Sequence, residues 1–415
     1  MNVVEHKPAR RDAVDLRRWP ALARPTSDPV RAMLARVFLR RVAARTGIRV
    51  DFPDGSHFGP AVGPLMNVRD PAAFFARLGQ DGKIGFGESY MACEWDSVDL
   101  VEVLEPLARQ ADSLVPRPVQ ILRHWYEARH PASESNDRAG AARNIVRHYD
   151  LSNDLFATFL DKSMTYSAAL FGEEHTTLAQ AQAHKIERLL DATGVRRGTR
   201  LLEVGTGWGE LALRAARRGA RVTSVTLSVE QATLARKRVA EAGLGALVDI
   251  RVEDYRDLVG TYDAIISVEM FEAVGEQWWP TYFRTLEECL ATGGRIGLQS
   301  ILMAHDRLEA TKSSWTWIHK YIFPGGLIPS EQAIRQTIRS HTSLEIVDHL
   351  RFGESYASTL RMWRQQFSNA VGDVERLGFD ETFRRMWSFF LAYSQAGFAS
   401  GYLDVAQFVM ARKNP

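Results

Sequence analysis

The sequence predicts an α/β protein in which a parallel sheet, with helices on both faces, follows a smaller α+β domain. Three observations lead to this prediction. The 415 residues exceed what one ordinary hydrophobic core accommodates, so two domains are expected. From residue 141 onward, apolar runs of strand length alternate with helical patterns, which is typical of a parallel sheet. A glycine-rich loop follows the first of these strands, where such a sheet binds its ligand.

Residues 1–27 contain Pro, Arg and Asp without periodicity, and we expect them to be mobile. A basic amphipathic helix over 29–47 opens the first domain, 28–128, and the first 50 residues hold 12 Lys and Arg against 4 Asp and Glu. This helix either binds an anionic membrane surface or packs as an ordinary surface helix. Its apolar and basic side chains interleave: Met33, Leu34, Val37, Phe38 and Val42 with Arg31, Arg36, Arg40, Arg41 and Arg45.

Two short strands around a PDG turn follow in 48–60, and helices over 70–82 and 99–111 each begin with an Asp suited to capping. The polar, breaker-rich stretch 129–140 is expected to be a linker. The second domain then spans 141–415. Its predicted strands are 199–205, 221–227, 248–254, 262–270, 295–302 and 404–413, and its predicted helices include 209–219, 228–243 and 281–294.

Composition excludes several functional classes. No apolar run is long enough to span a membrane, and the N-terminus lacks the apolar core of a signal peptide. Cys93 and Cys289 are too few for a disulfide framework or a cysteine zinc site, so we expect two buried thiols in a reducing cytoplasm and no metal. The net charge of +2 argues against a nucleic-acid partner.

Two stretches could carry chemistry. The loop GTGWGE offers Gly205, Gly207 and Gly209 for close approach to a ligand, in GxGxG spacing instead of the dinucleotide GxGxxG; a tight turn without a ligand is the alternative. The apolar strand in IISVEMFEAVG, 265–275, ends in two carboxylates, Glu269 and Glu272. These are either solvated or belong to a site at the ligand-binding edge of the sheet.

The sequence also resembles a family. EVGTGWGELA is similar to the first motif of class I S-adenosylmethionine (SAM) methyltransferases, which implies a Rossmann-like sheet of seven strands. Seven ordered motifs resemble the cyclopropane-fatty-acyl-phospholipid synthase family: HYDLSNDLF, MTYSAALF, VTLSVEQ, EDYRD, SVEMFEAVG, KYIFPGGLIPS and FGESYASTLRMW. SVEMFEAVG with YSAALF further resembles the actinobacterial branch that makes 10-methylene and 10-methyl (tuberculostearic-type) chains.

The resemblance implies a SAM site at matching positions. Gly205 and Gly207 would approach the methionine portion and Tyr166 and Ser167 would cover it. The ribose and adenine would be held by Thr226, Leu227, Gln231, Glu253 and Asp254.

Methyl transfer to an alkene creates a carbocation that must lose a proton, so the reaction needs a base and an apolar cavity. The resemblance implies a bound bicarbonate as that base, with ligands at Glu272, Ile301 and Tyr356. Two further ligand positions carry Ala168 and Gln299 where Cys and His are usual, and Glu269 replaces a usual glycine. We therefore predict that a protein carboxylate, Glu269 in preference to Glu272, takes over part of the role of bicarbonate. The alternative is bicarbonate held by Gln299 and Tyr356.

The implied activity is methylation of an oleoyl chain on a phospholipid to a 10-methylene chain, which a separate flavin- or nicotinamide-dependent reductase saturates. Cyclopropane formation is the main alternative; a small-molecule methyltransferase and a lipid-binding protein without activity are weaker ones. We expect a homo-oligomeric, cytoplasmic enzyme, peripheral at the inner face of the membrane, that meets phospholipid through its N-terminal domain. Aromatic side chains either line an acyl tunnel or build a core: Trp315, Trp317, Tyr321, Phe323, Trp387, Phe389 and Phe390.

Overall fold

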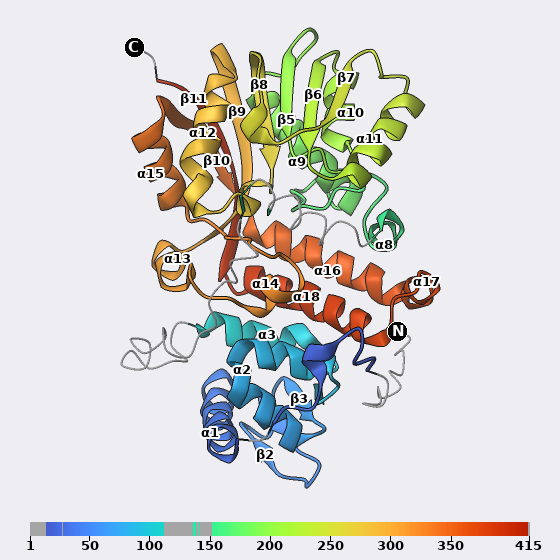
Figure 1. Ribbon diagram of the computed structural model, residues 1–415, viewed down its shortest axis with the longest axis vertical. Coiled ribbons are helices and arrows are strands. Elements are labelled where there is room, and N and C mark those ends of the chain that lie inside the picture. The colour runs from blue at the N-terminus through green and yellow to red at the C-terminus, as the bar shows by residue number, and fades with distance from the viewer. Residues whose placement is uncertain (1–13, 27, 112–135, 138–139, 141–151, 414–415) are drawn as a thin grey trace. The chain divides into compact units, whose positions relative to one another are not determined.

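The computed structural model describes residues 14–26, 28–111, 136–137, 140 and 152–413 (Figure 1). The chain divides into two compact units. The first comprises residues 1–128, 315–322 and 367–400, and the second comprises the remainder. Residues 315–322 and 367–400 therefore pack with the N-terminal domain, although the sequence pattern placed them in the second domain. Residues 1–13 and most of the predicted linker 129–140 lie outside the described part of the chain.

The first unit combines helices with a small sheet whose strand order is β2-β1-β3-β4. The predicted basic helix, the pair of strands around the PDG turn and both Asp-capped helices are all present. Helix α2 is longer than predicted and contains a break at Gly82. The elements are α1 (Pro29–Thr46), β1 (Arg49–Asp51), β2 (His57–Phe58), β3 (Leu65–Val68), α2 (Pro71–Met91), β4 (Trp95–Asp96), α3 (Leu100–Arg109), α14 (Trp317–Tyr321), α17 (Val371–Arg376) and α18 (Glu381–Ala399).

A buried arginine holds part of the N-terminal segment in place. Arg77, on α2, is 2% exposed and donates hydrogen bonds to the carbonyl oxygens of Ala21, Leu22 and Ala23. Leu22 is itself buried. The prediction of mobility over 1–27 is therefore wrong for this stretch, because a buried guanidinium needs acceptors and finds them there.

Most of the aromatic side chains proposed for an acyl tunnel build the core of the first unit. Trp317 is buried and its ring packs on Phe389 at 4.8 Å between centroids, while Trp387 and Phe390 pack at 5.2 Å. Gly87 leaves room for Trp317, since a Cβ there would lie 2.5 Å from the indole ring. For these residues the core interpretation is correct.

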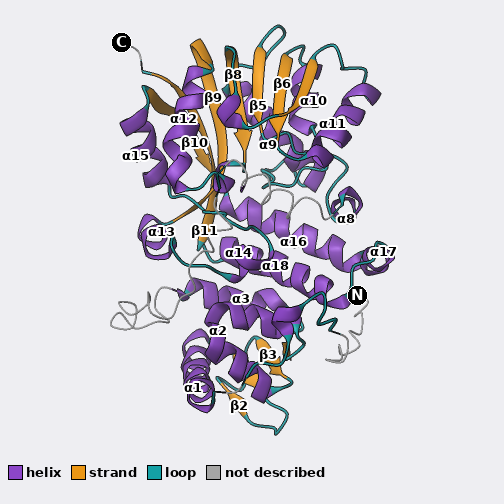
Figure 2. Cartoon of the chain, in the orientation of Figure 1, coloured by secondary structure: helices purple, strands orange, loops and turns teal. Residues whose placement is uncertain are grey.

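The second unit is built on a seven-stranded mixed sheet with the order β10-β11-β9-β8-β5-β6-β7, in which β11 is antiparallel to both neighbours (Figure 2). Its strands are β5 (Arg200–Val204), β6 (Arg221–Thr226), β7 (Val248–Val252), β8 (Tyr262–Val268), β9 (Leu290–Met303), β10 (Leu344–Arg351) and β11 (Leu403–Arg412). Its helices are α8 (Asn153–Ala157), α9 (Leu178–Ala192), α10 (Glu210–Arg217), α11 (Val229–Glu241), α12 (Trp279–Glu288), α13 (His305–Thr311), α15 (Glu331–His341) and α16 (Gly353–Asn369).

The α/β class and the predicted strands are confirmed, with three differences. The sheet was predicted to be parallel but is mixed, because β11 runs antiparallel to β9 and β10. Strand β10 was not predicted, because it is an edge strand whose residues are mostly exposed or half-buried and lack a clean alternation. The stretch ATGG, 291–294, was predicted to end a helix but belongs to β9. These residues form an irregularity in the strand, since Leu290 pairs with Tyr262 and pairing with β8 resumes at Arg295 opposite Ala264.

Helices cover both faces of the sheet, so the side chains on the two faces of a strand pack into two separate hydrophobic cores. Leu202 and Val204 on β5 pack with α12 and α15, whereas Leu201 packs with α9, α10 and α11. Because β5, β6, β7 and β8 are parallel, their carboxyl ends lie at one edge of the sheet, where the predicted site residues lie.

Cys93 and Cys289 are both free and buried, as predicted. Within the described residues, none of the helices is both long and apolar enough to cross a membrane.

Candidate active site

The glycine loop joins β5 to α10 and adopts backbone angles that favour glycine. Gly205 has φ +98° and Gly207 has φ +51°, both in the left-handed region. A Cβ on Gly205 would lie 3.3 Å from the Cβ of Met270, whereas a Cβ on Gly207 would meet nothing within 4 Å. A side chain at Gly205 would therefore press against Met270, whereas the backbone at Gly207 is open.

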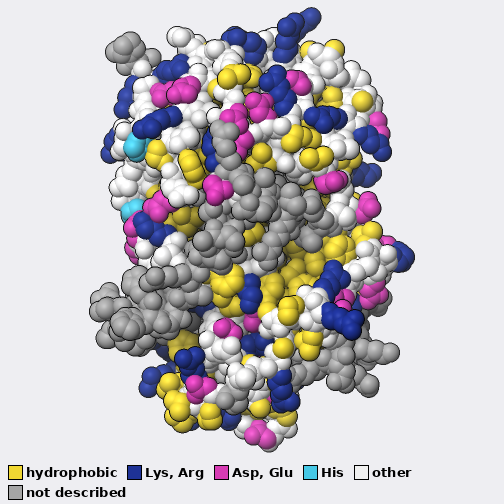
Figure 3. All heavy atoms as spheres, viewed as in Figure 1, with side chains coloured by type: hydrophobic (Ala, Val, Ile, Leu, Met, Phe, Trp, Pro, Cys, Tyr) yellow, Lys and Arg dark blue, Asp and Glu magenta, His cyan; other side chains and the backbone are white. Residues whose placement is uncertain are grey.

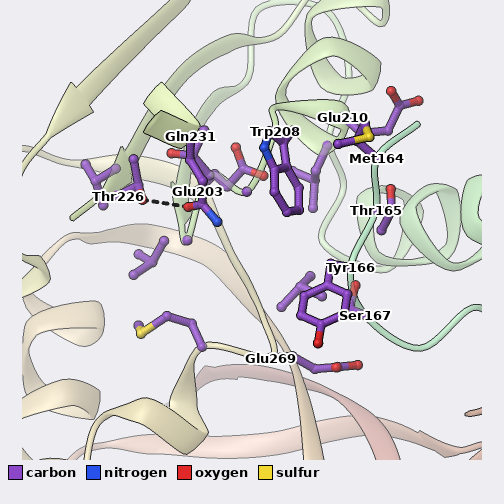
Figure 4. Close-up of a pocket in the computed structure, with 18 of the residues that line it drawn as sticks. Met164, Thr165, Tyr166, Ser167, Glu203, Trp208, Glu210, Thr226, Gln231 and Glu269 are labelled. Atoms are coloured by element: carbon purple, nitrogen blue, oxygen red, sulfur yellow. Dashed lines mark hydrogen bonds between the residues drawn. The ribbon is translucent and has the colours of Figure 1, made fainter. Parts of the chain in front are cut away.

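That pocket lies at the carboxyl ends of the central strands (Figure 4). Tyr166 and Ser167 lie with Glu269 on one side of it, and Thr226 with Gln231 on the other. Eight of the nine positions predicted for SAM line this pocket: Tyr166, Ser167, Gly205, Gly207, Thr226, Leu227, Gln231 and Glu253. Lining residues that the sequence analysis did not single out include Met164, Lys185, Glu203, Trp208 and Met270.

Polar groups in this pocket are held in fixed orientations. The Thr226 hydroxyl donates to the Gln231 side-chain oxygen at 3.0 Å, which leaves the amide nitrogen of Gln231 as a donor for a ligand. Glu203 is buried against the Ser224 hydroxyl, and burial raises its pKa to about 8. Asp254, the ninth predicted position, does not line the pocket; its carboxylate binds Arg256 with two contacts of 2.7 and 2.8 Å.

Replacing Gly205 by alanine is expected to weaken SAM binding by about tenfold, because a Cβ in the left-handed region costs roughly 1–2 kcal/mol and the loop will relax. Calorimetric titration with SAM would measure the change. The matched control is Gly243→Ala, which has a left-handed φ of +69° just after α11 and does not line the pocket beside the glycine loop. Equal affinities for Gly205→Ala and wild type would show that the loop does not contact the cofactor.

Glu269 sits at the end of β8 in an unusual backbone conformation. Its φ is +49°, a left-handed value that a residue with a side chain rarely adopts. Its N–H donates to the carbonyl oxygen of Gln299 at 2.8 Å, so pairing with β9 maintains this conformation. Local strain of this kind is common at functional sites.

The side chain of Glu269 accepts three hydrogen bonds. One oxygen accepts from the backbone N–H of Ala168 and from the side-chain amide of Gln299, each at 2.8 Å. The other accepts from the hydroxyl of Tyr356, also at 2.8 Å. These three donors come from the loop before α9, from β9 and from α16, so three segments converge on one carboxylate.

A chain of amides sets the orientation of Gln299. Arg188 can only donate, and it donates to the side-chain oxygen of Gln407 at 2.8 Å. The Gln407 amide nitrogen must then donate to Gln299, at 3.0 Å. This leaves the Gln299 amide nitrogen facing Glu269. Gln407 was not predicted; only its place on the buried strand β11, opposite Gln299, reveals it.

Glu272 lies one turn further along the chain and has fewer donors. One of its oxygens accepts from the backbone N–H of Ile301 and from the Ser300 hydroxyl. The other is buried and has no hydrogen-bond partner among the described residues. Burial first, and then the charge on Glu269, raise the pKa of Glu272 to about 8.

The site favours the charged form of the two carboxylates to different degrees. Burial raises the pKa of Glu269 as well, but Lys185 and three hydrogen-bond donors oppose this shift. Hydrogen bonds from the backbone and from Ser300 also lower the pKa of Glu272, but they do not offset burial and the charge on Glu269. The surroundings therefore favour the negative charge on Glu269 and the proton on Glu272.

The structure brings together all five residues predicted for catalysis: Glu269, Glu272, Gln299, Ile301 and Tyr356. It also adds Lys185, which is 1% exposed on α9 and donates to the Ser167 hydroxyl. A lysine on the same helix face as the buried Leu178, Ala181 and Leu189 is a signal that the sequence analysis passed over.

Comparisons with known proteins agree with this geometry. The family model described as mycolic acid cyclopropane synthetase matches residues 136–408. The tuberculostearic acid methyltransferase UfaA1 of Mycobacterium tuberculosis is 50% identical over 415 residues, which cover 97% of each chain. The cyclopropane-fatty-acyl-phospholipid synthase of Escherichia coli is 33% identical over 349 residues, or 84% of this chain and 87% of the relative.

Solved structures show the same architecture. The cyclopropane synthase MmaA2 of Mycobacterium tuberculosis aligns with a TM-score of 0.61 and 27% identity over 65% of this chain and 98% of its own. The mycolic acid cyclopropane synthase CmaA1, solved with SAH and CTAB, aligns with a TM-score of 0.61 and 28% identity over 66% of this chain and 98% of its own. The pocket at the glycine loop thus belongs to a class I methyltransferase fold.

Proposed function

The chain belongs to the mycolic acid cyclopropane synthetase family of SAM-dependent methyltransferases, and from this membership we propose that it methylates the double bond of an oleoyl chain on a phospholipid to give a 10-methylene chain. The 50% identity to a tuberculostearic acid methyltransferase supports a branched product. The observation that carries the proposal is the carboxylate of Glu269, held by three donors in the wall of the cofactor pocket.

The residues present fit the cofactor. Gly205 lines the pocket and Gly207 leaves its backbone open, Gln231 keeps an amide donor, and Ser167 and Glu253 add polar groups around the same pocket. When bound, SAM supplies an electrophilic methyl group. Lys185 positions the Ser167 hydroxyl and places a positive charge near Glu269.

We assign to Glu269 the task of receiving the proton that the lipid cation must lose. The alkene electron pair would form the new bond to the methyl carbon as the sulfur–methyl bond of SAM breaks, with the electron pair of that bond left on the sulfur of S-adenosylhomocysteine. The neighbouring chain carbon then becomes cationic. A hydride shift moves the positive charge to the methyl-bearing carbon. Glu269 then takes a proton from the transferred methyl, which leaves a methylene group. An anionic Glu269 also stabilises the cation before the proton leaves.

Bicarbonate is not required in this proposal. The donors that the family resemblance implies for bicarbonate, the Ala168 position, Gln299 and Tyr356, already bind Glu269. Bicarbonate held by Gln299 and Tyr356 would have to displace that carboxylate. Turnover in buffer freed of carbon dioxide should therefore equal turnover with added bicarbonate.

The pH dependence of turnover should report Glu269. The base must be ionised, so turnover should fall as the pH decreases through the raised pKa of Glu269. Because Lys185 lowers that pKa, Lys185→Met should move the acid limb of the kcat profile to higher pH. Ser167→Ala is the control: it removes the hydrogen-bond partner of Lys185 but keeps the charge. An unmoved limb in Lys185→Met would exclude this electrostatic role.

Proton NMR of the lipid product separates the two leading functions. The alternative is a cyclopropane product, which the Escherichia coli relative favours. The two products are isomers, so mass does not distinguish them. After incubation with oleoyl phosphatidylglycerol vesicles and SAM, vinylidene protons are expected; upfield ring protons would instead identify a cyclopropane synthase.

The proposal implies two partners. Saturation of the methylene group needs a reductant, so a separate flavin- or nicotinamide-dependent reductase would act next. The substrate lies in a bilayer, so we also propose that the enzyme is peripheral at the cytoplasmic face of the membrane. The predicted homo-oligomer is open to test by sedimentation.

A further inference from the structure

Helix α1 of the first unit has two apolar faces, and only one of them is used by the fold. Ala35, Leu39, Val42 and Ala43 are buried against the rest of the unit. On the other side, a stripe of five apolar side chains is 41–62% exposed: Val30, Met33, Leu34, Val37 and Phe38. Their spacing of i, i+3, i+4, i+7 and i+8 aligns them along one side of the helix. We call them the α1 stripe.

Arginines border the α1 stripe, but Arg36, which was predicted to belong to the basic face of the helix, contacts the rest of the first unit instead. Arg36 lies over the rings of Phe52, Phe58 and Phe75 at 5.3–5.5 Å, so it stabilises the unit. Arg31 lies on one flank of the stripe and pairs with Asp28 at 3.5 Å. Arg40 and Arg41 make no ion pair or hydrogen bond with the described residues and are exposed. Figure 3 shows hydrophobic and basic side chains side by side over α1, at lower left.

We propose that the α1 stripe inserts into an anionic phospholipid surface, with Arg40 and Arg41 binding the lipid phosphates. This proposal rests on the proposed function in one respect, namely that the substrate is a membrane phospholipid. An exposed apolar stripe bordered by arginines, on a helix without Asp or Glu, matches the chemistry of an interfacial helix.

The charge pattern favours lipid over a second copy of the chain. A symmetric dimer through α1 would place the same patch on both subunits. Each copy would then bring Arg31, Arg40 and Arg41 to the interface against one nearby acid, the capping Asp28, so the interface would hold an excess of positive charge. An anionic bilayer offers apolar chains and phosphates together, so it satisfies both parts of the surface.

Vesicle flotation with the full-length protein tests the proposal. The triple variant Leu34→Gln, Val37→Gln, Phe38→Gln should bind vesicles of mixed dioleoyl phosphatidylglycerol and phosphatidylcholine about 100-fold more weakly. The double variant Arg40→Gln, Arg41→Gln should bind these vesicles about 25-fold more weakly than wild type, or roughly fivefold per arginine. This difference in affinity should be smaller at high salt. The matched control replaces exposed valines elsewhere, Val62→Gln with Val98→Gln, and should bind like wild type.

Hydrogen exchange of the α2 amides, which should be unchanged, checks that the first unit of each variant is folded, and an unchanged SAM affinity checks the second unit. Wild-type binding in the triple variant would overturn the proposal. A wild-type dimer that the triple variant dissociates without vesicles would also overturn it, since the stripe would then be a subunit interface. Flotation needs no turnover, so normal lipid binding without any methylated product would refute the proposed function and leave this surface supported.

Discussion

Replacing Glu269 by glutamine is expected to lower the turnover of methyl transfer by about 100- to 10,000-fold, the usual contribution of a positioned general base. Glutamine keeps the shape but cannot accept a proton. Its amide also presents two donor hydrogens to a site that already holds Ala168 N–H, Gln299 and Tyr356 as donors. Steady-state turnover on oleoyl phosphatidylglycerol, with SAM affinity measured separately, would isolate the effect on the chemical step.

Glu272→Gln is the matched control, because Glu272 is a second buried carboxylate three residues away whose surroundings favour the protonated form. An amide oxygen can still accept from the Ile301 N–H and the Ser300 hydroxyl, and the amide nitrogen mimics a protonated acid. We expect this variant to keep turnover within about tenfold of wild type. Full turnover in Glu269→Gln, combined with dependence on bicarbonate, would show that bicarbonate is the base.

Replacing Arg77 by methionine is expected to destabilise the first unit by about 3–5 kcal/mol, because it leaves a buried charge without its partner. Arg77 binds Glu94, which is fully buried, at 2.9 Å and lies 3.8 Å from the buried Glu88. It also donates to three backbone carbonyls near Leu22. Hydrogen exchange of the α2 amides would measure the loss in the free energy of unfolding of the first unit.

Two further variants identify the cause of that loss. Arg109→Met breaks an exposed i,i+4 pair with Glu105 and should cost no more than about 0.5 kcal/mol. In the double variant Arg77→Met, Glu94→Met, both buried charges are removed, so much of the lost stability should return. A double variant as unstable as Arg77→Met would point to the lost carbonyl contacts instead of the unpaired charge.

The sheet and the cofactor pocket could be predicted because each rests on local patterns. Strands β5, β6 and β8 are apolar runs, and the loop after β5 is marked by glycines. Strand β10 depends on pairing with the distant strand β11, which local pattern does not record. For the same reason, local pattern did not distinguish Glu253, which lines the pocket, from Asp254, which binds Arg256.

The site was predicted as a set of residues but not as a network. Resemblance placed Glu269, Gln299 and Tyr356 in one site, but their hydrogen bonds required the structure. Lys185 and Gln407 were missed because each looks like an ordinary helix or strand residue. Their function follows from burial beside a carboxylate or amide from another segment. The exposure of the α1 stripe was also invisible, since the sequence does not reveal which apolar face is covered.

The first unit is built from three separate segments of the chain, and this has a consequence for its biosynthesis. Its core includes Trp387 and Phe389 of α18, near the end of the chain. A nascent chain on the ribosome therefore exposes the apolar surfaces of α2 and α3 until nearly all of the second unit has been made. We expect the N-terminal fragment 1–128 to aggregate when it is expressed alone. We therefore expect this protein to depend on chaperones during translation more than a protein whose first domain is complete early in synthesis.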